Sequence, residues 1–96
     1  MEKEKIIEII NAETPFLRNT YHIKKIGLFG SVARGDAREE SDIDILVEFE
    51  IPIGFFDFIR LETFLSKILG KKVDLVSSRA IKPSIRDDVL KDLIYV

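Results

Sequence analysis

The sequence lacks cysteine altogether and contains a single histidine, His22, among its 96 residues. A disulfide framework and a thiolate metal site are therefore excluded, and a histidine-rich metal site cannot be built. Any metal ion would have to be held by oxygen ligands. An excess of positive charge is also missing, because 15 basic residues face 17 acidic ones for a formal net charge of -2. Nucleic acid is consequently disfavoured as a partner.

Long hydrophobic runs are absent as well. The N-terminus, MEKEKIIEII, is charged and amphipathic, unlike a signal peptide, and no apolar run approaches the length of a membrane span. We therefore expect a cytoplasmic protein without membrane attachment. Its length of 96 residues, with 46% hydrophobic and 33% charged residues, is typical of one globular domain covering residues 1–96.

Hydrophobic spacing predicts helices at both ends of the chain and in its middle. Residues 2–11 place isoleucines between charged residues at helical spacing, and Thr14-Pro15 is expected either to interrupt this helix or to restart it. Residues 55–69 form the main predicted helix, which is followed by a glycine C-cap. A last amphipathic helix is predicted over about residues 83–93.

Three strands are predicted between these helices, at residues 23–29, 43–49 and 72–76. In and beside the second, isoleucine and valine point to one face while Asp42 and Asp44 point to the other. The order of elements predicts an α/β (α+β) fold, a small mixed β-sheet with helices on one face. The other face would then be free to carry a site.

Two apolar residues of the main helix, Phe56 and Ile59, fall outside its apolar stripe. Three explanations are open for them. They could form an exposed patch that binds a partner, they could be buried beneath residues 51–53, or they could meet a second copy in a homodimer.

Gly30-Ser31 directly follows the first predicted strand and precedes a polar stretch, VARGDAREES. Glycine lets the backbone approach a ligand closely, and amides at a helix start bind anions, with the Ser31 hydroxyl as an extra donor. The pair is therefore a candidate phosphate-binding turn. Taken alone, it is also explained as an ordinary strand-to-helix turn in which Ser31 is the N-cap.

Acidic residues recur on the predicted strands. Asp42 and Asp44 lie on one face, roughly 7 Å apart, where they could share divalent cations or simply keep an exposed strand soluble. Asp74 stands between apolar neighbours in a short strand, an unfavourable place for aspartate unless its charge is needed. An exposed strand position explains Asp74 alone equally well. Three carboxylates from two neighbouring strands could hold two Mg²⁺ ions about 4 Å apart, the geometry for in-line phosphoryl or nucleotidyl displacement.

Three further residues are weaker candidates. Arg34 lies between the turn and the carboxylates, where its guanidinium could steady a triphosphate through charge-assisted hydrogen bonds. Arg38 is explained at least as well as a solvated loop charge. Ser41 could orient Asp42 or bind phosphate, although polar residues commonly begin strands. His22 has no candidate ligands near it in the sequence, which favours a structural over a catalytic interpretation, and no role is assigned to it.

The combination of Gly30-Ser31, Asp42-x-Asp44 and a later strand Asp74 resembles the nucleotidyltransferases of the DNA polymerase beta superfamily. More narrowly, GLFGSVARGDAREESDIDILVEF, the lysine-proline step into the last helix and the terminal IYV look like minimal nucleotidyltransferases, called MNT domains. The resemblance spans about residues 23 to 96 and implies the polymerase beta-like nucleotidyltransferase fold. It also implies that the glycine and serine bind nucleotide phosphates, that Asp42 and Asp44 ligate both metal ions, and that Asp74 completes the catalytic metal site.

The same resemblance implies an activity and a partner. MNT proteins are typically antitoxins paired with HEPN-type ribonuclease toxins, and some transfer AMP from ATP to a tyrosine of the toxin in a Mg²⁺-dependent reaction. We therefore expect a protein adenylyltransferase that uses ATP as substrate and two Mg²⁺ ions as cofactor. The alternative is a non-catalytic, nucleotide-binding module that neutralises its partner by binding alone.

Overall fold

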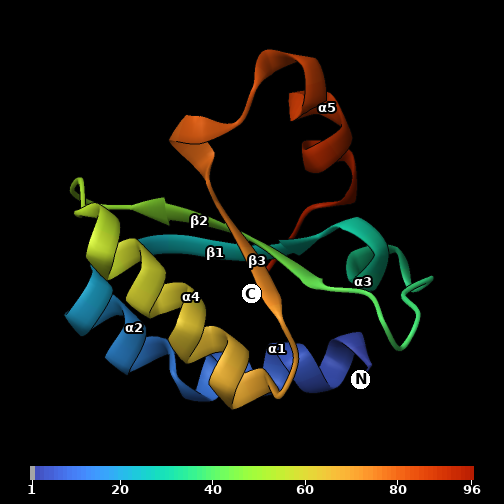
Figure 1. The fold of residues 1–96 in the computed structure, drawn as a ribbon, viewed down its shortest axis with the longest axis horizontal. Helices are drawn as coiled ribbons and strands as arrows, with labels where there is room; N and C mark the ends of the chain where they lie inside the picture. Colours follow the sequence, from blue (N-terminus) through green and yellow to red (C-terminus); the bar gives the residue numbers. More distant parts are fainter. Residues whose placement is uncertain (1) are drawn as a thin grey trace.

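The computed structural model describes residues 2–96, with the elements drawn in Figure 1. The helices and strands, in chain order, are α1 (Lys3–Ala12), α2 (Thr14–Tyr21), β1 (Ile23–Phe29), α3 (Gly30–Arg34), β2 (Ile43–Phe49), α4 (Phe55–Leu69), β3 (Val73–Ser77), the 3-10 turn η1 (Ser78–Ala80), α5 (Pro83–Asp92) and β4 (Ile94–Tyr95).

Most of the predicted elements are present. The strands at 23–29 and 43–49 and the helix at 55–69 have the predicted bounds, and the third strand is shifted by one residue to 73–77. Thr14-Pro15 restarts the helix, because proline occupies the first turn of α2, where its missing N–H costs nothing. The two-residue strand β4 was not predicted, since a segment this short carries no alternation of its own.

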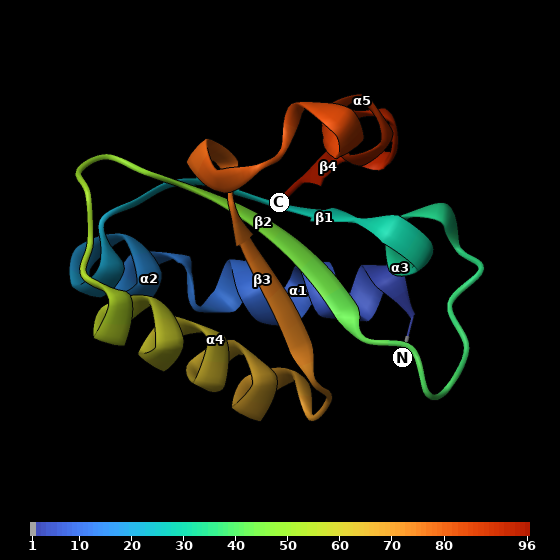
Figure 2. The same cartoon turned by 45° about the horizontal axis from the view of Figure 1, so that its top comes forward.

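The four strands form one mixed sheet in the order β3-β2-β1-β4. β1 pairs antiparallel with both β2 and β4, whereas β2 and β3 are parallel. Figures 1 and 2 show α1, α2 and α4 together on one face, as expected, and α5 on the opposite side of the sheet. The predicted open face is therefore partly overhung by the last helix.

The last helix packs less apolar surface than its pattern suggests. Val89 is its buried residue, whereas Ile85, one turn earlier, is 48% exposed. α5 contacts α3 and β1, and Leu93, the residue that follows it, lies against Gly27 of β1. Its N-terminal turn stands clear of the sheet, which leaves the Ile85 side chain in solvent.

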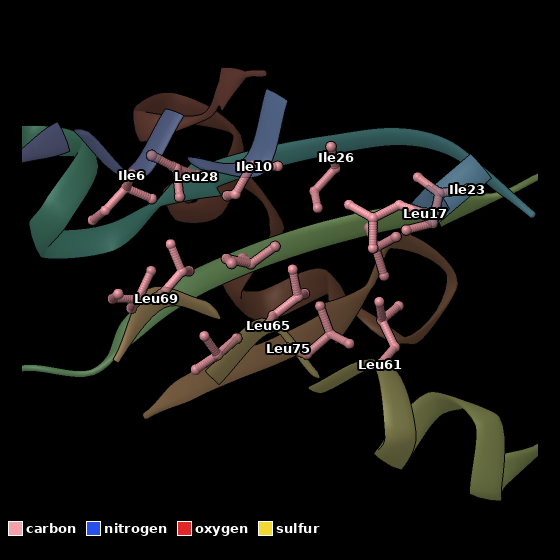
Figure 3. Close-up of a cluster of buried hydrophobic side chains, with 14 of the residues drawn as sticks. Ile6, Ile10, Leu17, Ile23, Ile26, Leu28, Leu61, Leu65, Leu69 and Leu75 are labelled. Carbon is pink, nitrogen blue, oxygen red and sulfur yellow. The ribbon is translucent and has the colours of Figure 1, made fainter. Parts of the chain in front are cut away.

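The core fills the space between the sheet and α1, α2 and α4 (Figure 3). It is built by inward-facing isoleucine, leucine and valine side chains from every one of these elements, and the largest fully buried are Ile6, Ile10, Leu17, Leu28, Ile43, Ile45, Leu61, Leu65, Leu69, Val47 and Val73. The stripe predicted on the main helix therefore faces the core. No helix within residues 2–96 has the length and apolar character needed to cross a lipid bilayer.

Candidate active site

The turn from β1 into α3 brings its backbone against a carboxylate of the neighbouring strand. Gly30 has a φ of +72°, a conformation that only glycine adopts without strain. A Cβ at this position would collide with Asp44 Oδ2 and would lie 3.1 Å from Asp44 Cγ. Gly30 is thus required for two reasons, and it places the first turn of α3 directly beside Asp44.

Parallel pairing then sets a second carboxylate beside the first. Asp44 of β2 and Asp74 of β3 are register partners, so neighbouring strands present them side by side on the open face. Burial raises the pKa of Asp44, and the negative charges of Asp74 and Asp42 raise it further, while Arg34 lowers it. The carboxylates therefore form a cluster of negative charge, and their mutual repulsion opposes the stability of the fold.

Asp42, the third predicted carboxylate, lies at the entrance of β2. Its Oδ2 is 3.8 Å from Lys72 Nζ, an exposed ion pair. Its charge acts on Asp44, but among residues 2–96 no three acidic or histidine side chains converge into a complete metal site. The three carboxylates expected to converge therefore do not form one group. Asp44 and Asp74 lie side by side, whereas Asp42, although its charge reaches Asp44, does not complete a group of three with them.

Two side chains of α4 hold the strand that carries Asp74. β3 is an edge strand, and its outward amides at Val73 and Leu75 donate hydrogen bonds to Ser66 Oγ at 3.0 Å and Glu62 Oε2 at 3.0 Å. These bonds flank Asp74 on both sides and satisfy the unpaired edge of the sheet. Sequence reasoning missed this pair, although their spacing of four residues on a helix was visible.

Comparison with known families agrees with this geometry, because the family description "Nucleotidyltransferase domain" matches residues 3–96. The chain belongs to the nucleotidyltransferase domain family. A curated relative from Thermococcus cleftensis, named protein adenylyltransferase MntA, is 43% identical over 93 residues, which cover 97% of this chain and 94% of that protein. The predicted resemblance to nucleotidyltransferases is thereby confirmed.

Solved structures place the fold in the same family. A structure described as a minimal nucleotidyltransferase superposes with a TM-score of 0.83 at 38% identity and covers 98% of this chain and 95% of that one. A second, described as tri-AMPylated Shewanella oneidensis HEPN toxin in complex with MNT antitoxin, has a TM-score of 0.64 at 25% identity. It covers 97% of this chain and 66% of that one. The narrower likeness to MNT domains is thus confirmed as well.

The carboxylates of this nucleotidyltransferase fit a hard divalent cation. Their donors are oxygens, and the raised pKa of Asp44 shows that burial and unneutralised negative charge coincide there. Mg²⁺ is usually held by one or two carboxylates together with substrate phosphates, and not by a closed protein cage. Asp44 and Asp74, with Asp42 beside them, are therefore the residues that would hold it.

The remaining predicted site residues are placed differently. Arg34 ends α3, and its Nη1 donates to Asp92 Oδ2 at 2.8 Å. Ser41 Oγ accepts a hydrogen bond from the Arg38 amide at 2.9 Å, so its hydroxyl closes the loop before Asp42. Ser31 lies half-buried in the first turn of α3, next to Gly30. Ser31 and Arg34 thus flank the carboxylates, whereas Ser41 has a local structural partner.

His22 lies at the other end of β1 and has a structural position. It caps α2 with a φ of +57°, and its carbonyl oxygen accepts a hydrogen bond from the Glu50 amide at 2.8 Å. A histidine there joins the start of β1 to the end of β2, far from Asp44. Its interpretation as a structural residue therefore agrees with the fold.

Proposed function

We propose that this nucleotidyltransferase is an antitoxin that transfers AMP from ATP to a tyrosine hydroxyl on a HEPN-type toxin partner. The observation that carries the proposal is the contact of Gly30 with Asp44, beside Asp74. It unites a backbone turn suited to phosphates with carboxylates suited to Mg²⁺. The names of the similar MntA adenylyltransferase and of the AMPylated toxin complex support the acceptor class.

The proposed chemistry is an in-line displacement at the α-phosphorus of ATP. The acceptor oxygen forms a bond to phosphorus, the bond to the pyrophosphate oxygen breaks, and the hydroxyl proton passes to the Asp74 carboxylate. Gly30 and Ser31 would hold the phosphates, and Arg34 would steady the leaving pyrophosphate. Two Mg²⁺ ions held by Asp42, Asp44 and Asp74 would, when bound, neutralise phosphate charge and lower the pKa of the acceptor hydroxyl.

A transfer experiment tests this proposal. The purified protein is incubated with α-labelled ATP, Mg²⁺ and the product of an adjacent reading frame as the candidate toxin, and label on that partner is measured. We expect covalent label with the natural protein and none with Asp44→Asn. Glu48→Gln serves as the matched control, because Glu48 lies on the same strand and face but outside the proposed site. Label that persists in Asp44→Asn, or that is lost in Glu48→Gln, would contradict the site assignment.

A second function, neutralisation by binding alone, is favoured by one surface. Phe55 and Phe56 are 72% and 75% exposed at the start of α4, and Ile51 and Ile59 are also exposed. Phe55 and Ile51 line an apolar hollow of about 500 Å³ together with Phe58 and the end of β3, whereas Phe56 and Ile59 lie outside its lining. Burial of Phe56 and Ile59 beneath residues 51–53 is therefore ruled out, and the partner-binding and homodimer explanations stay open.

The two functions differ in what Asp44→Asn does to toxicity. If AMP transfer is required, Asp44→Asn fails to protect cells from the toxin, and the toxin carries no label. If binding suffices, Asp44→Asn protects fully although no label is transferred. Phe56→Ser is the complementary variant, because it should weaken partner binding while it leaves the carboxylates unchanged.

A further inference from the structure

Arg34 is joined to Asp92, a carboxylate on the last helix that no sequence motif marks. Arg34 Nη1 donates to Asp92 Oδ2 at 2.8 Å, and Nε donates to Asp36 Oδ2 at 3.2 Å. Asp36 is two residues away and its side chain is 62% exposed, so this pair constrains little. Asp92 is 17% exposed and 58 residues away, so its bond fixes the guanidinium against a distant part of the fold.

Asp92 is itself firmly placed. It is the last residue of α5, one turn after the buried Val89, and α5 contacts both α3 and β1. The next residue, Leu93, packs on Gly27, where a Cβ would lie 2.8 Å from Leu93 Cδ1. β4 follows and pairs with β1, the strand that leads into Gly30. Asp92 and the phosphate-binding turn are therefore anchored to the same strand.

Arg34 keeps donors for an anion while it is held in this way. A guanidinium has five N–H groups, and within residues 2–96 the bonds to Asp36 and Asp92 use two of them. The positive charge reaches the carboxylates as well, since it lowers the pKa of Asp44 against the effects of burial and of the neighbouring aspartates. The free donors thus lie close to where the phosphates of a nucleotide would be bound.

We infer that Asp92 is a positioning residue, which holds the Arg34 guanidinium in the orientation that binds the triphosphate of the nucleotide. The inference rests on the proposed function, because it needs a nucleotide at Gly30 and Ser31. An arginine free in solvent loses side-chain entropy when it binds a phosphate. The bond to Asp92 fixes the Arg34 side chain during folding, so that less entropy is lost when the nucleotide binds. Asp92 does not touch the nucleotide itself.

The test measures the dissociation constant of Mg²⁺ and AMP-PNP by calorimetry, without any acceptor. We expect Arg34→Gln to weaken binding about 10-fold or more, and Asp92→Ala about 3- to 10-fold. The double variant should bind no more weakly than Arg34→Gln alone, because both changes act through one group. Asp88→Ala, which removes an exposed carboxylate of the same helix, should leave the dissociation constant unchanged.

Three results would overturn the inference. The first is an Asp92→Ala variant that binds AMP-PNP as tightly as the natural protein, or more tightly, even where its Tm falls. The second is additivity of the Asp92→Ala and Arg34→Gln effects, and the third is an Arg34→Gln variant without effect. If Asp92→Ala does not fold, Asp92→Ser replaces it, since serine is too short to reach Arg34. A natural protein that binds no AMP-PNP would instead refute the nucleotide site of the proposed function.

Discussion

The two faces of β2 differ in the burial and charge of their side chains. Ile43, Ile45 and Val47 point toward the helices and are 0% exposed, whereas Asp44 and Glu48 point toward the open face and are half-buried. On the helix side, charge has no place because no water or partner would solvate it. On the open side, the fold keeps a carboxylate whose pKa is raised, mainly by burial. One strand therefore contributes to stability on one face and to the proposed active site on the other.

The largest expected effect separates chemistry from stability at Asp44. Asp44→Asn should lower AMP transfer by about 1,000-fold or more, because charge neutralisation at the phosphates depends on this carboxylate. The free energy of unfolding at pH 7 should not fall, since the change removes an ionised group that the folded state disfavours. Transfer rates and urea unfolding of the same preparation test both halves. A variant that loses its fold would mean that Asp44 is structural.

The neighbouring residue should show the opposite result. Ile45→Ala removes buried core volume and is expected to cost about 2–5 kcal/mol in the free energy of unfolding. Transfer per folded molecule should stay near the natural value, because Ile45 points away from the site. Urea unfolding gives the stability, and transfer is normalised to the folded fraction. If the variant is stable but inactive, the two faces are not independent.

Gly30 contacts Asp44 on the open face of β2, and its substitution should both strain the backbone and lower activity. Gly30→Ala is expected to destabilise the fold by about 1–2 kcal/mol, because of its positive φ, and to displace Asp44 as well. Gly70→Ala is the matched control, since Gly70 has a φ of +68° but no atom near the added Cβ. Both variants should lose stability on thermal melting, but only Gly30→Ala should lose transfer by more than its unfolded fraction. Equal transfer in the two variants would contradict the importance of this contact.

A smaller effect is expected in the pH dependence of stability. The raised pKa of Asp44 means that the folded state binds this proton more tightly than the unfolded chain does. The resulting stabilisation is fully present below the ordinary carboxyl pKa of about 4 and is lost as pH rises through the raised pKa. In metal-free buffer, the natural protein should therefore lose stability relative to Asp44→Asn between acidic and neutral pH. A difference that stays constant with pH would show that the carboxylate is not strained.

The smallest effect on stability is expected at the exposed end of α4. Phe56→Ser should change the free energy of unfolding by less than about 0.5 kcal/mol, because the ring is 75% exposed. Partner binding, measured by calorimetry with the toxin, should weaken if this surface is the interface. Size-exclusion chromatography of both proteins distinguishes the homodimer explanation. A large loss of stability would mean that the ring packs in a way that its exposure does not suggest.

Much of the open face could be predicted, because it depends on spacing along single elements. The pleat of a strand puts Asp44 on the face opposite Ile43 and Ile45 whatever the rest of the chain does. Helical periodicity likewise selected the stripe of α4 that the core buries, and left Phe56 and Ile59 outside it. Gly30 was recognisable as a candidate because it directly follows a predicted strand and glycine lets the backbone approach a ligand closely.

Contacts between distant segments could not be predicted in the same way. Whether Asp74 meets Asp44 depends on parallel pairing and its register, and a slip of one residue would turn Asp74 to the other face. Glu62 and Ser66 accept hydrogen bonds from the edge amides of β3, and Arg34 donates to Asp92. The sequence alone does not predict these bonds, because each joins two separate elements. The two residues of β4 are too few for any pattern.

Local geometry thus decided which side chains share a face, since the periods of strand and helix follow from backbone dihedrals alone. Tertiary structure decided which faces meet. It set Asp44 against Gly30 and Asp74, and it brought the end of α5 back to hold Arg34. Those contacts exist only after the sheet has formed on its core, because the entropy of bringing distant segments together is offset by burial of apolar surface.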